Sequence, residues 1–216
     1  MIDTQDQEEL FRLIADYLEE DIKCIAIGGT AMMFQGYKTT TKDIDLVFEN
    51  DKERGVFIRA IEKLGYAQKS LKFVYSENRL ASKNKPLLYS RGDERFDLFA
   101  KDVFGFEIEK EKFVQRHDFI GKKELIIFTL SKDYLILLKA ITSREKDYED
   151  IETIVEVEKN IDWDSIIDAA IQKRRQMTWI LHDLEETMQK LKKVAFIKKG
   201  HFEKIYEAER DFSKKK

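Results

Sequence analysis

Apolar positions in the first part of the chain follow two different periods. Where they recur every three or four residues, the spacing predicts helices, over residues 8–19, 30–34 and 56–64. Where they form short runs rich in β-branched and aromatic residues, the pattern predicts strands, over residues 22–27, 43–48, 72–75, 95–99 and 125–129. The early part of the chain is therefore expected to mix helices and strands.

After Thr129 the pattern is helical only. Ser131 is an expected N-cap, helices are expected over 134–141 and 148–157, and Asp162 is expected to cap a third helix that extends as far as Lys199. Within this third helix, apolar residues step by four and three, which makes a heptad seam of Met177, Leu181, Leu184, Met188, Leu191 and Ala195. The seam is shorter than three heptads, so packing within the chain is favoured, with a homodimer through residues 177–195 as the alternative.

Composition narrows the class of protein. Apolar residues make up 43% and charged residues 38% of 216 residues, which excludes a disordered chain. No run of about 18 apolar residues occurs, so no membrane span is expected. The first nine residues are acidic, unlike a secretory signal, and the single cysteine, Cys24, lies in an apolar run. We therefore expect a soluble cytoplasmic protein without disulfides.

Charge is unevenly distributed along the chain. The net charge is -3, yet from Ile171 to the end there are 13 Lys or Arg against 7 Asp or Glu. Glu and Lys alternate here as on solvated helical faces, and this interpretation is favoured. The alternative is that the basic tail contacts a phosphate backbone.

The segment from Ile25 to Phe48 carries the most informative chemistry. Gly28 and Gly29 follow a buried strand and precede a helix, an arrangement that leaves backbone N–H groups open to phosphate, although such a pair is also a common turn. Asp43 and Asp45 lie two residues apart on a predicted strand. Because side chains alternate between the two faces of a strand, both carboxylates face the same side, with Cα atoms about 7 Å apart. Adjacent like charges repel, and a divalent cation such as Mg²⁺ removes that conflict.

These residues resemble the pattern of the DNA polymerase β-like nucleotidyltransferase superfamily, especially its small prokaryotic members related to abortive-infection toxins and the minimal nucleotidyltransferases. The matching residues are Ile27, Gly28 and Gly29, then thirteen residues, then Asp43-Ile44-Asp45-Leu46. The resemblance implies an α/β (α+β) nucleotidyltransferase core with a short mixed sheet over residues 1–130. An all-helical C-terminal part over residues 131–216 would follow it.

A third acidic residue, Asp97, lies in an otherwise apolar strand segment. Asp is depleted in strands, so either a function or a half-exposed strand accounts for it. The resemblance implies that Asp43, Asp45 and Asp97 are the catalytic carboxylates and hold two Mg²⁺ ions, with Mn²⁺ as a substitute.

The resemblance also implies a set of nucleotide-binding residues. Gly28, Gly29 and Thr30 would hold the β- and γ-phosphates, Lys139 and Arg144 would bind the triphosphate, and Asp147 would orient them. The alternative for Arg144 is an exposed, charged helix linker.

Three functions are compared on this basis. The first is transfer of a nucleoside monophosphate from an NTP to a hydroxyl of RNA such as a tRNA end, of a protein or of a small molecule, with release of pyrophosphate. The second is a nucleotidyltransferase-like binding module that acts as the antitoxin or regulatory partner of a toxin–antitoxin pair. The third, a phosphatase with a DxDxV motif, needs an apolar strand before Asp43, but residues 36–42 read GYKTTTK.

Overall fold

A computed structural model of the chain describes residues 1–71, 85–142 and 144–213. The chain divides into two compact units, Met1–Leu130 and Ser131–Lys216, and each is described by itself. Among the described residues, none of the helices combines the length and the apolar character that crossing a membrane requires. The strand expected over residues 72–75 lies outside the described residues.

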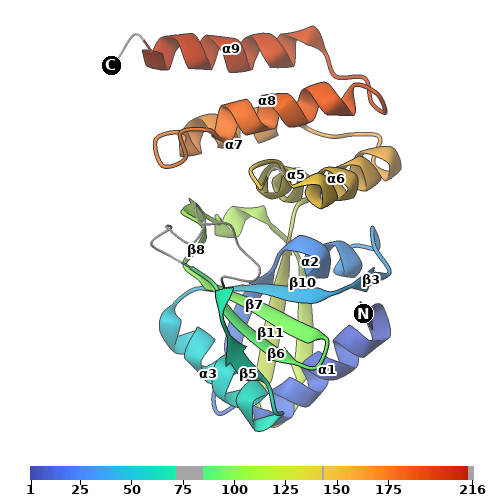
Figure 1. The fold of residues 1–216 in the computed structure, drawn as a ribbon, viewed down its shortest axis with the longest axis vertical. Helices are drawn as coiled ribbons and strands as arrows, with labels where there is room; N and C mark the ends of the chain where they lie inside the picture. The colour runs from blue at the N-terminus through green and yellow to red at the C-terminus, as the bar shows by residue number, and fades with distance from the viewer. Residues whose placement is uncertain (72–84, 143, 214–216) are drawn as a thin grey trace. The chain divides into compact units, whose positions relative to one another are not determined.

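A mixed seven-stranded sheet forms the first unit, which confirms the predicted α/β class (Figure 1). Its order is β10-β11-β2-β4-β7-β6-β5, in which β11 pairs parallel with β2, β4 pairs parallel with β7, and the other neighbours are antiparallel. The strands are β2 (Ile22–Ala26), β4 (Asp43–Phe48), β5 (Ala67–Lys69), β6 (Leu87–Arg91), β7 (Glu94–Ala100), β10 (Phe113–Ile120) and β11 (Glu124–Leu130).

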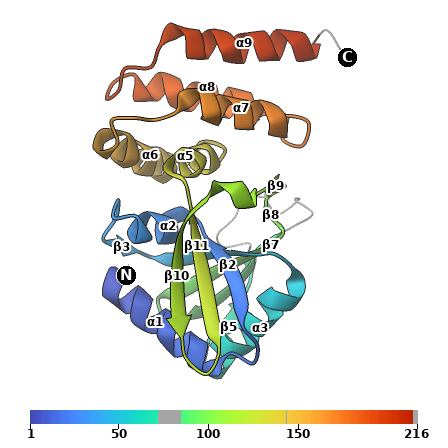
Figure 2. The same ribbon diagram turned by 180° about the vertical axis from the view of Figure 1, so that it is seen from behind.

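Helices α1 (Thr4–Tyr17) and α3 (Asp51–Lys63) cover one face of this sheet (Figures 1 and 2). The ring of Phe57 on α3 lies 5.2 Å from that of Phe48 on β4 and 5.5 Å from that of Phe96 on β7. Even-numbered residues of β4 and β7 therefore face the helices, and because side chains alternate along a strand, the odd-numbered residues face the other side.

Shorter elements complete the first unit. Helix α2 (Gly28–Phe34) follows β2 directly, and two small sheets pair β1 (Ile2–Asp3) with β3 (Thr40–Thr41) and β8 (Asp102–Val103) with β9 (Phe106–Glu107). A 3₁₀ turn, Lys110–Lys112, precedes β10. Cys24 is buried, as its apolar surroundings predicted.

Helices alone form the described part of the second unit: α5 (Lys132–Ala140), α6 (Glu145–Val157), α7 (Trp163–Lys173), α8 (Ile180–Leu191) and α9 (Lys199–Ser213). Ser131 and Asp162 cap α5 and α7 as predicted, accepting hydrogen bonds from Tyr134 N and Ser165 N. The prediction of one helix from Asp162 to Lys199 is wrong, because the helix ends at Lys173 and a new one begins at Ile180.

The heptad seam lies mainly on α8 and packs within the chain. Its four members on this helix are fully buried, and α8 contacts α5, α7 and α9. These side chains are therefore already covered in one copy of the chain. The four members are Leu181, Leu184, Met188 and Leu191.

Candidate active site

Asp43 and Asp45 open β4 and lie on the face of the sheet away from α1 and α3. Both are partly exposed, whereas Ile44 between them is buried against the helices. The strand begins at Asp43, directly after the polar residues 36–42, so no apolar strand precedes Asp43. This is the arrangement of adjacent carboxylates that the alternation predicted, and it does not suit the phosphatase alternative.

Asp97 lies beside these residues on β7. The parallel register pairs Asp45 with Asp97 and Asp43 with Arg95, and paired residues of neighbouring strands point to the same face about 4.8 Å apart. Asp97 is only 1% exposed. Three carboxylates from two strands thus share one face of the sheet.

The glycine turn lies directly against Asp45. Gly28 has a φ of +57°, and a Cβ atom added there would come closer than 3.0 Å to the Asp45 carboxylate. A Cβ atom on Gly29 would lie 2.5 Å from Thr41 Oγ1. Position 28 therefore requires glycine for both its backbone conformation and its space.

Thr30 ties this turn to β4. Its side chain is fully buried, and its hydroxyl accepts a hydrogen bond of 3.0 Å from the Asp45 backbone N–H. The Ile27 N–H donates to the Asp45 carbonyl at 3.1 Å. The turn and the second carboxylate are thus held in one position relative to each other.

Arg95 lies among the carboxylates and was not among the site residues predicted from the sequence. Its Nε is 3.0 Å from Asp97 Oδ1, and its Nη2 contacts Asp43 Oδ2. The spacing of Arg95 and Asp97, two residues apart on a strand, is the signal that places both side chains on one face. The guanidinium supplies the positive charge that this acidic group requires.

The donor chemistry of the three aspartates fits a divalent cation, since Mg²⁺ prefers carboxylate oxygens completed by phosphate oxygens. The absence of a side chain at Gly28 lets the Asp45 carboxylate lie directly against the glycine turn. Among the described residues, no three His, Cys, Asp or Glu side chains meet in an arrangement ready to hold a metal ion. Instead, Asp43 and Asp97 contact the guanidinium of Arg95.

A cavity of about 310 Å³ lies on the same face of the sheet, further along β4. Val47, two residues beyond Asp45, lines the cavity. Ile25, which pairs with Val47 in the sheet, and Phe128, which pairs with Ile25, line it too. The Phe113 ring stacks on Phe128 at 5.0 Å and 24°. Three exposed lysines, Lys23, Lys101 and Lys110, also line this cavity, together with Glu49, which pairs with Lys110 at 3.1 Å.

Lys139, Arg144 and Asp147 meet in the second unit. Lys139 is buried on α5, and its Nζ lies 2.6 Å from Asp150 Oδ2 and 3.4 Å from Asp147 Oδ1. Arg144 precedes α6 with an exposed side chain, and its Nε lies 2.5 Å from Asp147 Oδ2. Asp150 was not singled out in the sequence, although its spacing of three residues from Asp147 puts both on one helical face.

The charges around Asp147 favour its ionised form. Burial alone raises the pKa of its carboxyl, but the Arg144 hydrogen bond, the charge of Lys139 and the Thr142 hydroxyl together outweigh burial. The pKa of Asp147 is therefore below its ordinary value. Asp147 thus stays ionised while it holds two cationic side chains.

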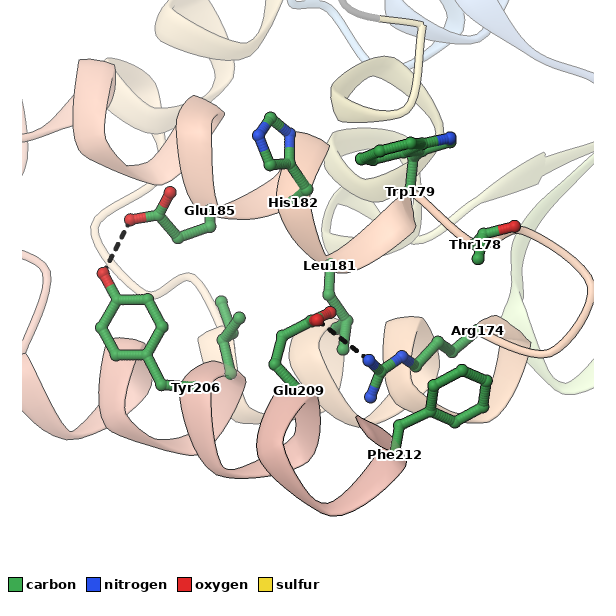
Figure 3. A pocket seen from close by; sticks show the side chains of 10 residues that line it. Arg174, Thr178, Trp179, Leu181, His182, Glu185, Tyr206, Glu209 and Phe212 are labelled. Atoms are coloured by element: carbon green, nitrogen blue, oxygen red, sulfur yellow. Dashed lines mark hydrogen bonds and ion pairs between the residues drawn. The ribbon is translucent and has the colours of Figure 1, made fainter. Parts of the chain in front are cut away.

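A second cavity, of about 360 Å³, lies between α7, α8 and α9 (Figure 3). It contains none of the predicted site residues. On one wall Arg174 pairs with Glu209 at 2.9 Å, and on another Tyr206 donates a hydrogen bond of 2.8 Å to Glu185. Arg174, Glu209 and Glu185 thus have partners within this cavity.

Comparison with known proteins agrees with this geometry. A family model described as "Nucleotidyltransferase of unknown function (DUF6036)" matches residues 6–204, and the chain belongs to this family. The match confirms the resemblance to nucleotidyltransferases that the glycine pair and the paired aspartates indicated. Among curated proteins, none matches the chain.

Two solved structures are similar to this chain at low sequence identity. A crystal structure of ANT(2")-Ia in complex with adenylyl-2"-tobramycin is 17% identical, with a TM-score of 0.45, over 76% of this chain and 94% of that chain. The crystal structure of JHP933 from Helicobacter pylori is 12% identical, with a TM-score of 0.43, over 99% of this chain and 94% of that chain.

Proposed function

We propose that this protein transfers a nucleoside monophosphate from an NTP to an acceptor hydroxyl and releases pyrophosphate. The observation that carries the proposal is the shared sheet face of Asp43, Asp45 and Asp97 beside the Gly28 turn. Membership of a nucleotidyltransferase family supports the same reaction class.

The reaction is an in-line displacement at the α-phosphorus. The acceptor oxygen forms a bond to the α-phosphorus while the bond to the bridging oxygen of the pyrophosphate breaks. In this proposal Asp97 accepts the proton of the attacking hydroxyl, because it shares one sheet face with Asp43 and Asp45. Asp43 and Asp45, together with Asp97, would hold the divalent cations, two Mg²⁺ or Mn²⁺ ions. When bound, these cations neutralise phosphate charge and align the reacting groups.

The chain's own residues also bind the triphosphate in this proposal. The backbone N–H groups of Gly28 and Gly29 face the β- and γ-phosphates, and Thr30 acts by fixing the turn to Asp45 through its hydroxyl. Arg144 binds phosphate through its exposed guanidinium. Lys139 adds positive charge from its buried position, and Asp147 orients both cationic side chains.

The acceptor that we propose is an RNA end, for example that of a tRNA. The cavity beside Val47 combines an aromatic pair, Phe113 and Phe128, with three exposed lysines. Single-stranded nucleic acid is bound by aromatic stacking combined with positive charge. A base would stack on the aromatic pair, and the lysines would contact the backbone phosphates.

Label transfer tests the reaction. With Mg²⁺ present, label from the α-phosphate is expected to pass to the acceptor and label from the γ-phosphate is not. The double variant Asp43→Asn, Asp45→Asn is expected to lose transfer by at least a thousandfold, while Asp118→Asn, an exposed aspartate on β10, keeps it. Transfer of γ-label would contradict the proposal.

A charge-reversal series tests the acceptor. Lys23→Glu, Lys101→Glu and Lys110→Glu combined are expected to lower labelling of RNA at least tenfold. The matched control combines Lys52→Glu, Lys69→Glu and Lys122→Glu, which are exposed lysines that do not line the cavity. Equal labelling of RNA by the two triple variants would contradict an RNA acceptor. Labelling of protein alone, when RNA and protein are offered together, would contradict it as well.

The contact of Arg95 with Asp43 and Asp97 favours a second candidate function, a regulatory module that binds NTP without turnover. Such a module could act as the antitoxin or regulatory half of a toxin–antitoxin pair. Tight NTP binding without label transfer to any of the RNA, protein and small-molecule acceptors would favour this second function.

A further inference from the structure

Arg95 is the side chain that the proposed reaction leaves without a role. Its guanidinium contacts two of the three candidate metal ligands, with Nε 3.0 Å from Asp97 Oδ1 and Nη2 beside both Asp43 Oδ2 and Asp97 Oδ2. The exposed fraction of its side chain is 26%, against 19% for Asp43 and 1% for Asp97. The guanidinium thus binds the acidic group from its accessible side.

A guanidinium and a divalent cation compete for the same carboxylate oxygens. Carboxylates on neighbouring strands repel each other unless a positive charge lies between them. A planar guanidinium can bridge two carboxylates, as Arg95 does here, where Nη2 donates to both Asp43 Oδ2 and Asp97 Oδ2. A metal ion that takes both Asp43 and Asp97 as ligands must therefore displace Arg95.

We infer that Arg95 is a resident counter-ion of the catalytic carboxylates, which the metal–nucleotide complex displaces. This inference rests on the proposed function. Metal alone binds weakly, because it must break the contacts of Arg95 with no new anion for the guanidinium. The triphosphate supplies that anion, so nucleotide and metal each strengthen binding of the other. Arg95 is a positioning residue in the free protein and a phosphate contact in the complex.

Binding of Mn²⁺ tests this inference without an activity measurement. Mn²⁺ is titrated into the full-length chain and followed by electron paramagnetic resonance, with and without a non-hydrolysable α,β-methylene ATP. Arg95→Gln is expected to bind Mn²⁺ alone about tenfold more tightly than the wild type. The factor by which the nucleotide strengthens Mn²⁺ binding is expected to shrink by about the same amount.

Two further variants serve as controls. Arg116→Gln removes an exposed arginine on β10, paired with Asp118 and Glu124, and is expected to leave both Mn²⁺ affinities unchanged. Arg95→Lys keeps the charge but not the two-pronged geometry, and its Mn²⁺ affinity is expected between those of the wild type and Arg95→Gln. Thermal melts report folding: without metal, Arg95→Gln is expected to melt below the wild type, and Mn²⁺ is expected to close that gap.

Asp43→Asn separates failure of this inference from failure of the proposed function. If Asp43→Asn abolishes Mn²⁺ binding and Arg95→Gln leaves it unchanged or weaker, the role of Arg95 is overturned and the metal site stands. If Asp43→Asn leaves Mn²⁺ binding unchanged in both the wild-type and Arg95→Gln backgrounds, the proposed function is overturned, and the inference about Arg95 with it.

Discussion

Position 28 carries the tightest steric constraint in the candidate site. The backbone there is left-handed and lies against the Asp45 carboxylate, so any side chain would push the turn away from the carboxylate. Gly36 is a natural comparison, since it has a φ of +77° and nothing within 4 Å of an added Cβ. Comparing substitutions at Gly28 and Gly36 therefore separates the cost of a left-handed backbone from the cost of a clash with Asp45.

Gly28→Ala is therefore expected to abolish nucleotidyl transfer, and Gly36→Ala to retain it. Both variants introduce a left-handed non-glycine residue, which costs roughly 1–2 kcal/mol in unfolding free energy. The clash with Asp45 adds to this cost only at position 28. Urea unfolding measures the stabilities and α-label transfer the activities. Equal loss of activity in the two variants would contradict a specific role for the turn.

Asp147 makes the stability of the second unit depend on pH. Its pKa is lowered in the folded chain, so its contribution is fully present above the unfolded value of about 3.9 and is lost as pH falls through the folded value. Asp147→Asn lacks this contribution. The gap in urea midpoint between the wild type and Asp147→Asn is expected to be widest near neutral pH and to narrow below about pH 4. A gap that stays constant down to pH 3 would rule out this linkage.

Among the elements, several with an apolar face could be predicted, whereas β6 and β10 were not expected from the sequence. The strand 43–48 and the cap at Ser131 match the sequence pattern, because both depend on local spacing. β10 was missed because most of its residues are exposed at the edge of the sheet, so it lacks the alternation of a half-buried strand. The break after Lys173 was missed because residues 160–199 contain no Gly or Pro.

Arg174 connects α7 to α9 after that break. It is 7% exposed, donates to the Ala208 carbonyl, pairs with Glu209 and lies 4.1 Å from the centroid of the Phe212 ring. Arg174→Met is expected to lower the unfolding free energy by about 1–3 kcal/mol, because the half-buried Ala208 carbonyl loses its donor and Glu209 loses its ion pair. Hydrogen exchange across residues 199–213 measures the loosening.

Arg175→Met is the matched control for this prediction, since the neighbouring arginine is exposed. Its hydrogen exchange is expected to equal that of the wild type within error. Faster exchange of α9 in both variants would mean that the charge of this segment, and not the contacts of Arg174, holds the helix.

Over the whole molecule, the predicted site residues fall into two groups, one in each unit. The spacing of Asp43 and Asp45 was enough to predict their shared face, because alternation is a local property. The contact of Arg95 with Asp43 depends on the register between β4 and β7, over 50 residues apart in the chain, and no single-sequence pattern specifies that register. Asp150, a second partner of Lys139 on α6 besides the predicted Asp147, was missed because its contact depends on how α5 packs on α6.

In the second unit, substitutions at Arg144 and Lys139 are expected to affect different properties, NTP binding for Arg144 and stability for Lys139. Arg144→Gln, at an exposed guanidinium, is expected to raise KM for the NTP about tenfold with little change in stability. Lys139→Met removes a buried cation from Asp150 and Asp147, although Asp147 keeps its contact with Arg144, and is expected to cost about 3–5 kcal/mol in unfolding free energy. Steady-state kinetics and urea unfolding measure the two effects. An unchanged KM in Arg144→Gln would remove Arg144 from the nucleotide site.

The position of β11 in the sheet has a consequence for synthesis on the ribosome. β2 is made early, but its second neighbour is β11, the last strand of the unit to be translated. At ~5–20 residues per second, the stretch between β4 and β11 takes roughly 4–15 s to emerge. During that time the unpaired edge of β2 can pair with another nascent chain. When several ribosomes translate one mRNA, binding of a chaperone to this protein would therefore be favoured until residue 130 has been made.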